Sequence, residues 1–224
     1  MNPILLSIVL LVLPYLLGSI ATAIWVSRGL YGVDIRTQGS KNAGSTNMFR
    51  ILGFKAGILT QVVDIGKGTL AAALPWLVQV IWLGQTHIFS DWDMEMQKLA
   101  CGLLAVIGHI YPVFEGFKGG KGINTLLGMM LAVNPIAAGI CLLVWVVALW
   151  FSRYVAVASI LAVGSYPLYI LIASWYRGME ANWSLVVLGL GMLALVVFTH
   201  RSNIQRLMSG TEDRNKWFDK LRKG

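Results

Sequence analysis

The sequence is poor in charged residues, and above all in acids. Asp, Glu, Lys and Arg make up only 12% of it, against about 25% in a soluble domain, which argues against an ordinary soluble protein. The ten acidic residues form no carboxylate cluster for Mg²⁺ of the kind that phosphoryl transfer uses. The two cysteines, Cys101 and Cys141, lie inside apolar runs and are expected to pack as small hydrophobes. We therefore expect neither a disulfide scaffold nor a metal site nor a cofactor.

Apolar residues dominate the chain instead. They make up 57% of it and include nine tryptophans, and the mean hydropathy is +0.69. The net charge of +8 is concentrated in short segments that flank apolar runs, which is typical of cytoplasmic loops and not of nucleic-acid binding. The sequence therefore predicts an all-α, polytopic membrane protein whose partner is the lipid bilayer.

Seven transmembrane helices are predicted, some of them short or broken. Within 51–84, Asp64–Gly68 interrupts the apolar run, and the interruption fits either a re-entrant half-helix followed by a span or one broken span. The run 123–151 would be about 44 Å long as a single helix, too long for one span. Asn134-Pro135 divides it, because the residue before a proline disfavours helix. The predicted segments are 3–26, 51–63 with 69–84, 97–114, 123–133, 135–151, 154–176 and 183–200.

Charge predicts how these helices are oriented. Segments rich in Lys and Arg belong on the cytoplasmic side, and the acidic segment 85–96 belongs outside. Seven crossings satisfy this bias, with the N-terminus outside and the basic tail 201–224 in the cytoplasm. We find no internal repeat and no low-complexity linker, so residues 1–224 are expected to form a single integral membrane domain.

The stretch Gly108–Thr125 has the composition of an anion-binding site. Its glycines let the backbone approach a ligand, its lysines add positive charge, and a helix that restarts there adds donors. The residues concerned are Lys118, Gly119, Gly120, Lys121, Asn124 and Thr125. The alternative is a glycine-rich loop whose lysines lie at the membrane surface. His109, in the same stretch, is either structural or catalytic.

Three further polar clusters fall on the same predicted side. Gly39–Arg50 offers hydroxyl, amide and guanidinium donors suited to phosphate, or is a solvated loop. Asp64 and Lys67, three residues apart on a helix, are a further polar element or a salt bridge that permits burial. His200 and Asn203 share a helix face in a basic segment that lipid headgroups could also bind. Dense donors and scarce acids predict a site for more than one phosphate, without a metal.

These clusters carry motifs that match a known family. They are G-S-x-N-x-G-[AS]-T-N-x-x-R at Gly39–Arg50, D-x-x-K-G at Asp64–Gly68, G-H-x-x-P-V-F-x-x-F-K-G-G-K-G at Gly108–Gly122 and H-R-x-N-I-x-R-L-x-x-G-x-E at His200–Glu212. In this order, over nearly the whole chain, they resemble the bacterial acyl-phosphate:glycerol-3-phosphate acyltransferases. Ser45 stands where alanine is common in that family, and Ala43 where proline or valine is common, and neither change removes a polar group.

The resemblance implies a fold, a reaction and a location. The fold has seven spans with the active site at the cytoplasmic face of the bacterial inner membrane. The enzyme transfers the acyl group of an acyl phosphate to the sn-1 hydroxyl of glycerol 3-phosphate in phospholipid biosynthesis, and gives lysophosphatidic acid and phosphate. An enzyme that produces acyl phosphate is expected upstream, and the sequence indicates no oligomeric state. The alternative function is a membrane transporter of a phosphorylated solute, which broken helices would suit.

The resemblance also implies site residues. Lys67 is expected in the glycerol 3-phosphate pocket, and the Gly119 and Gly120 amides are expected to hold phosphate. The base is either a histidine or an oxygen of the departing phosphate. The expected catalytic residues are Ser40, Arg50, His109, Lys121, His200 and Asn203. The expected substrate- or phosphate-binding residues are Gly39, Asn42, Thr46, Asn47, Lys67, Gly68, Lys118, Gly119, Gly120, Gly122 and Thr125.

Overall fold

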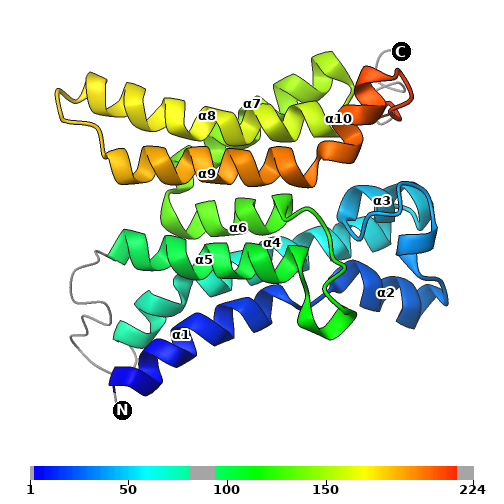
Figure 1. Cartoon of the computed structure of the whole chain (residues 1–224), viewed down its shortest axis with the longest axis horizontal. Coiled ribbons are helices and arrows are strands. Elements are labelled where there is room, and N and C mark those ends of the chain that lie inside the picture. Colours follow the sequence, from blue (N-terminus) through cyan, green and yellow to red (C-terminus); the bar gives the residue numbers. More distant parts are fainter. Residues whose placement is uncertain (1–2, 81–93, 216–224) are drawn as a thin grey trace. The chain divides into compact units, whose positions relative to one another are not determined.

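The computed structural model describes residues 3–80 and 94–215, and every regular element within these ranges is helical (Figure 1). The predicted all-α class is confirmed. The chain divides into two compact units, Met1–Pro135 and Ile136–Gly224. The elements are α1 Pro3–Gly18, α2 Thr22–Tyr31, η1 Ile35–Thr37, α3 Ser45–Ile51, α4 Phe54–Val78, α5 Met94–Ile110, η3 Val113–Glu115, α6 Ile123–Val133, α7 Pro135–Ser152, α8 Val155–Tyr176, α9 Trp183–Thr199 and α10 Arg201–Met208.

Several helices have the length and composition of membrane spans. In the described ranges, three segments qualify singly, and five do if each of two bent helix pairs counts as one span. α6 is apolar but shorter than these. Most of the acidic segment predicted to face outside, residues 85–93, lies outside the described residues, as do 81–84 of the predicted span 69–84 and 216–224 of the basic tail.

The first apolar run is two helices and not the single helix predicted over 3–26. α1 ends at Gly18 and α2 begins at Thr22, with a bend of 43° between them. Between the two helices, the Ile20 carbonyl accepts a hydrogen bond of 2.7 Å from Lys67 Nζ of α4. The prediction was wrong because it treated the run as an isolated helix, whereas a donor from another helix stabilises the break.

α4 is continuous from Phe54 to Val78, so the interruption expected at Asp64–Gly68 is absent. Lys67 Nζ lies 2.9 Å from Asp64 Oδ1, one turn earlier on the same helix. The two charges therefore pair within the helix and need no break in it. The division of 123–151 is confirmed, since α6 ends at Val133 and α7 begins at Pro135.

α4 is the central helix of the first unit and packs against α1, α5 and α6. Glycines bring the backbones together, as is common between membrane helices. A Cβ at Gly68 of α4 would collide with the Thr125 carbonyl of α6, and one at Gly128 of α6 would collide with the Ile65 carbonyl of α4. Their close approach positions the start of α6. The segment that leads into α6, residues 116–122, is called the glycine–lysine loop below.

The segment 27–50, which is mostly polar in sequence, has a small hydrophobic core of its own. Ile24 of α2, Ile35 of η1 and Met48 of α3 are fully buried together. Ala56 at the start of α4 belongs to the same core. This core holds the Gly39–Arg50 segment against α2 and α4, so the segment is an ordered part of the first unit.

In the second unit, α8 and α9 pack side by side (Figure 1). Trp145 Nε1 of α7 donates to Ser159 Oγ of α8 at 3.3 Å. α10 continues from α9 after a bend of 61°. The fourth predicted cluster thus lies at the corner between α9 and α10.

Candidate functional site

A buried polar cluster lies where α4 passes the α1–α2 break. Asp64 Oδ1 accepts a hydrogen bond from Thr22 Oγ1 at 3.1 Å and pairs with Lys67 Nζ at 2.9 Å. His109 Nδ1 of α5 lies 3.6 Å from the same oxygen. The Asp64 and Lys67 side chains are only 2% and 3% exposed. A buried charge needs such partners, so Lys67 is part of this cluster, and its place in the glycerol 3-phosphate pocket stays a prediction.

The glycine–lysine loop folds back over His109. A Cβ at Gly120 would collide with His109 Nε2 and would lie 2.7 Å from the Ala43 carbonyl, so only glycine fits there. The Gly120 amide donates to the His109 carbonyl, and the Gly119 amide donates to the Ile110 carbonyl, both at 3.1 Å. These two amides satisfy carbonyls at the end of α5. Both amides therefore donate within the protein, and their contact with a phosphate stays a prediction.

Asn47 organises the Gly39–Arg50 segment from within. Its Oδ1 accepts from the Ser40 backbone N–H at 3.1 Å, and its Nδ2 donates to three backbone carbonyls. These carbonyls belong to Gln38 at 3.0 Å and to Ile35 and Asn42 at 3.2 Å. The side chain is buried and its hydrogen-bonding capacity is used. Asn47 therefore holds the loop together from within, and its contact with the substrate stays a prediction.

Two contacts join the Gly39–Arg50 segment to the glycine–lysine loop. One is the approach of Gly120 to the Ala43 carbonyl described above. The other is a hydrogen bond of 2.9 Å from Asn124 Nδ2, in the first turn of α6, to Ser45 Oγ, at the start of α3. An alanine at position 45 could not accept this bond. The first and third predicted clusters are thus neighbours, as expected for parts of one site.

The remaining predicted residues of the first unit differ in exposure. Ser40, Arg50 and Lys118 are exposed, whereas Lys121 is partly buried. Thr125 is fully buried, and its hydroxyl has no hydrogen-bond partner among the described residues. Of the others, Gly39 is exposed, Asn42 and Thr46 are partly buried, and Gly68 and Gly122 are buried.

In the second unit, Glu212 holds the fourth cluster together. Asn203 Nδ2 donates to Glu212 Oε1 at 2.6 Å, and Arg206 Nε donates to Glu212 Oε2 at 2.7 Å. His200 Nδ1 lies 2.9 Å from the Val196 carbonyl of α9. The sequence motif contains Glu212, but the residue received no role because its partners, six and nine positions earlier, meet it only after α10 has turned.

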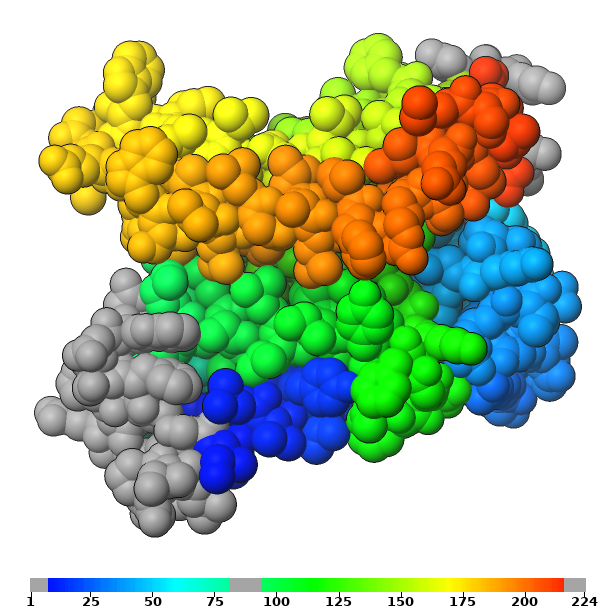
Figure 2. Space-filling model, in the orientation of Figure 1, coloured from blue at the N-terminus to red at the C-terminus, as the bar shows by residue number. Residues whose placement is uncertain are grey.

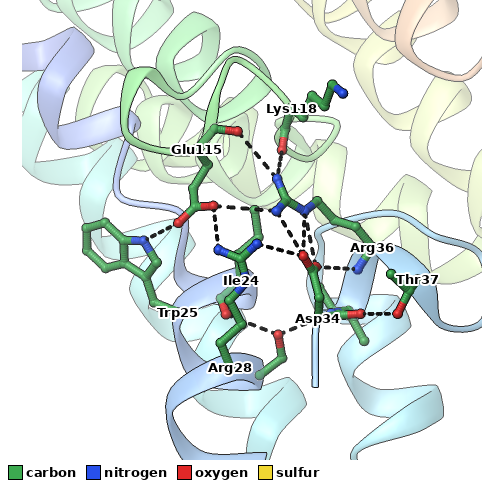
Figure 3. Close-up of polar contacts among 10 residues, drawn as sticks. Ile24, Trp25, Arg28, Asp34, Arg36, Thr37, Glu115 and Lys118 are labelled. Carbon is green, nitrogen blue, oxygen red and sulfur yellow. Dashed lines mark hydrogen bonds and ion pairs between the residues drawn. The ribbon is translucent and has the colours of Figure 1, made fainter. Parts of the chain in front are cut away.

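A network of charges that the sequence did not predict lies beside the glycine–lysine loop (Figure 3). We call it the loop clamp, formed by Trp25, Arg28, Asp34, Arg36 and Glu115. Hydrogen bonds from the Arg36 guanidinium and backbone and from Arg28 hold the pKa of Asp34 well below its usual range. The same pairing raises the pKa of Arg36. Arg28 and Glu115 are 87 positions apart, so no local pattern could have linked them.

Known proteins resemble this chain over nearly its whole length. The family described as glycerol-3-phosphate acyltransferase matches residues 8–210. A glycerol-3-phosphate acyltransferase of Salinibacter ruber is 44% identical, over 94% of this chain and 93% of its own length. One of Chlorobaculum tepidum is 39% identical, over 92% of this chain and 94% of its own length.

Two solved structures have the same fold. Both are of PlsY (YgiH), an integral membrane glycerol 3-phosphate acyltransferase that is 38% identical to this chain. Its glycerol 3-phosphate form matches with a TM-score of 0.78 over 96% of this chain and 98% of its own. Its lysophosphatidic acid form matches with a TM-score of 0.74 over 93% of this chain and 94% of its own. These matches do not favour the transporter alternative. The chain belongs to the glycerol-3-phosphate acyltransferase family of integral membrane proteins.

Proposed function

We propose that this protein transfers the acyl group of a fatty acyl phosphate to the sn-1 hydroxyl of glycerol 3-phosphate, giving 1-acyl-glycerol 3-phosphate (lysophosphatidic acid) and phosphate. One observation carries the proposal. The Gly39–Arg50 segment contacts the glycine–lysine loop and the start of α6, at Ala43–Gly120 and at Ser45–Asn124. The forms in which PlsY was solved support glycerol 3-phosphate as acceptor and lysophosphatidic acid as product.

The proposed reaction balances without a cofactor. The hydroxyl oxygen bonds to the acyl carbon, the bond from that carbon to the phosphate oxygen breaks, and the hydroxyl proton leaves with the phosphate. Because an acyl phosphate is already activated, the protein needs mainly to orient two anions and to stabilise the developing charge. We assign phosphate contacts to Ser40, Arg50 and Lys121. The burial of His109 beneath Gly120 supports a phosphate oxygen as the proton acceptor.

The proposal extends to location. We place the protein in the bacterial inner membrane with seven crossings, the N-terminus outside and the active site facing the cytoplasm, as one membrane domain. The basic segments 27–50 and 201–224 support this orientation. An enzyme that forms acyl phosphate would act upstream. His200 and Asn203, in the second unit, stay predicted site residues.

The test is an assay of the purified protein with acyl phosphate and glycerol 3-phosphate. Phosphate release and lysophosphatidic acid formation should be equal, and a chelator should leave both unchanged. Acyl transfer only from a thioester donor would contradict the proposed donor. Uptake of glycerol 3-phosphate into proteoliposomes without any acyl product would contradict the reaction.

The phosphate contacts are tested by Arg50→Ala and Lys121→Ala. Each should lower turnover by about a hundredfold or more, as is typical when a group that stabilises developing charge is removed. Lys55→Ala is the matched control, because Lys55 is an exposed lysine of the same unit outside all four clusters. Turnover at the wild-type rate by Lys121→Ala would remove that residue from the phosphate site.

A further inference from the structure

The Glu115 carboxylate is held from three sides, although it lies in a surface loop (Figure 3). Trp25 Nε1 donates to Oε1 at 2.9 Å, and Arg28 donates to Oε2 at 3.0 Å. Arg36 lies 3.6 Å from the same Oε2. The Glu115 side chain is only 11% exposed, whereas that of Arg28 is 47% exposed. Both donating helix residues come from α2, so Glu115 fixes the start of the glycine–lysine loop to that helix.

The Arg36 side chain binds the backbone of the same loop. Its guanidinium donates to the Glu115 carbonyl at 3.4 Å and to the Lys118 carbonyl at 3.5 Å. Asp34 fixes the guanidinium in turn, with contacts of 2.9 to 3.3 Å between their side chains. Arg36 therefore contacts both ends of the four-residue turn 115–118.

This turn has a conformation that needs support. Gly116 and Phe117 both have positive φ angles, of 63° and 60°. Glycine adopts this region freely, but for an aromatic residue it is uncommon and costs free energy. Within the loop, the turn is also held by hydrogen bonds to the Pro112 carbonyl from the Phe117 amide at 2.9 Å and from the Glu115 amide at 3.1 Å. Gly116, Phe117 and Lys118 are exposed, so little else covers the turn, and Figure 2 shows the bright green part of the first unit at the surface beside the blue segments.

The turn leads directly into the residues with the proposed phosphate role. Lys118 ends it, and Gly119, Gly120 and Lys121 follow. We propose that Glu115 and Arg36 are positioning residues for acyl transfer: through the loop clamp they fix the turn 115–118, and thereby the place of Lys121 relative to the Gly39–Arg50 segment. This inference rests on the proposed function for its catalytic consequence, and on the contacts above for its geometry.

Charge balance supports a positioning role over direct binding. In the sequence, the segment 27–50 carries Arg28, Arg36, Lys41 and Arg50 against one acid, Asp34. In the structure the clamp contains two guanidinium groups and two carboxylates, joined by four ion pairs of 2.7 to 3.6 Å. The clamp is neutral within itself, so its arginines are matched before any phosphate arrives.

Glu115→Ala and Glu115→Gln test the loop directly. Limited trypsin digestion, with the cut located by mass spectrometry, should cleave after Lys118 about tenfold faster in Glu115→Ala than in wild type, because the clamp no longer opposes local opening. Glu115→Gln keeps the shape and an acceptor, so it should fall between the two. The exposed Glu180, in the turn between α8 and α9, provides matched controls in Glu180→Ala and Glu180→Gln.

Kinetics test the consequence. kcat/KM for glycerol 3-phosphate should fall about tenfold in Glu115→Ala and in Arg36→Gln, a modest value for a misplaced site group, while Glu180→Ala keeps the wild-type value. Because the two residues hold one turn, the double variant should lose little more kcat/KM than the single variant with the larger loss.

Three results would overturn the inference in an active wild type: unchanged cleavage after Lys118, faster cleavage without any loss of kcat/KM, or losses that simply add in the double variant. A wild type inactive with both substrates, but with faster cleavage in Glu115→Ala, would instead refute the proposed function.

Discussion

At the scale of single residues, Lys67 has structural contacts that the motif did not predict. Its ammonium group is buried against Asp64 and the Ile20 carbonyl. These two contacts join α4 to the break between α1 and α2. A lysine in this environment stabilises the unit around the site, whereas its place in the substrate pocket stays a prediction.

Replacing Lys67 by methionine tests this assignment. Lys67→Met would leave Asp64 as an uncompensated buried charge, so the free energy of unfolding should fall by about 3–5 kcal/mol. The thermal midpoint of the purified protein in detergent measures the effect. The double variant Asp64→Asn/Lys67→Met should regain most of the loss, since neither charge remains. A normal midpoint together with a raised KM for glycerol 3-phosphate would return Lys67 to the substrate pocket.

Asp34 predicts a dependence of stability on pH. Its pKa is lowered in the folded protein by Arg36 and Arg28, so its contribution is complete above its unfolded pKa, near 3.9. The contribution is lost as pH falls below that value towards the lower folded pKa. Asp34→Asn should therefore be less stable than wild type at pH 7, and the gap in thermal midpoint should narrow below about pH 4.

The sequence predicted that two of the polar clusters lie close together, but not which partners their side chains contact. The proximity of Gly39–Arg50 to Gly108–Gly122 was expected from shared chemistry and is found at Ala43–Gly120. The partners of Asn47 and Glu115 were missed for different reasons. Asn47 bonds to backbone carbonyls of a loop that has no regular pattern, and Glu115 bonds to arginines that only the folded α2 brings near.

At the scale of elements, apolar runs and proline placed most helices well. The predictions for 154–176 and 183–200 agree with α8 and α9, and Asn134-Pro135 marks the end of α6 as expected. Both errors concern polar groups inside apolar runs. The α1–α2 break and the continuity of α4 depend on the same Lys67 contacts, which are tertiary and have no signature along either helix.

Two glycines of α4 offer a matched pair of variants. Gly68→Ala would place a Cβ against the Thr125 carbonyl of α6, and overpacking of this kind costs about 1–3 kcal/mol. Gly66→Ala, half a turn away, meets nothing within 4 Å and should gain about 0.5–1 kcal/mol from its better helix propensity. Thermal midpoints of the two variants measure the difference. Equal midpoints would mean that α4 and α6 do not pack through these glycines.

At the scale of the whole molecule, the proposed crossings make a prediction about which surfaces are accessible from each side. In a variant with Cys101 and Cys141 replaced by alanine, single cysteines can be placed at the exposed positions Thr37, Glu180 and Ser202. A membrane-impermeant thiol reagent added to intact cells should label position 180 alone. In inverted vesicles it should label positions 37 and 202. Labelling of 180 and 202 from one side would exclude α9 as a span.

The shortness of α6 has a consequence for how the protein is made. An 11-residue helix is about 16 Å long, well below the roughly 30 Å of a hydrocarbon core, so it is a poor substrate for insertion by itself. α4 and α5 are synthesised before α6. When α6 follows, its glycine contact with α4 lets it pack against protein instead of lipid. With α6 as one of the seven proposed crossings, weakening that contact at Gly68 should leave it uninserted in some nascent chains and reverse the orientation of every helix made after it.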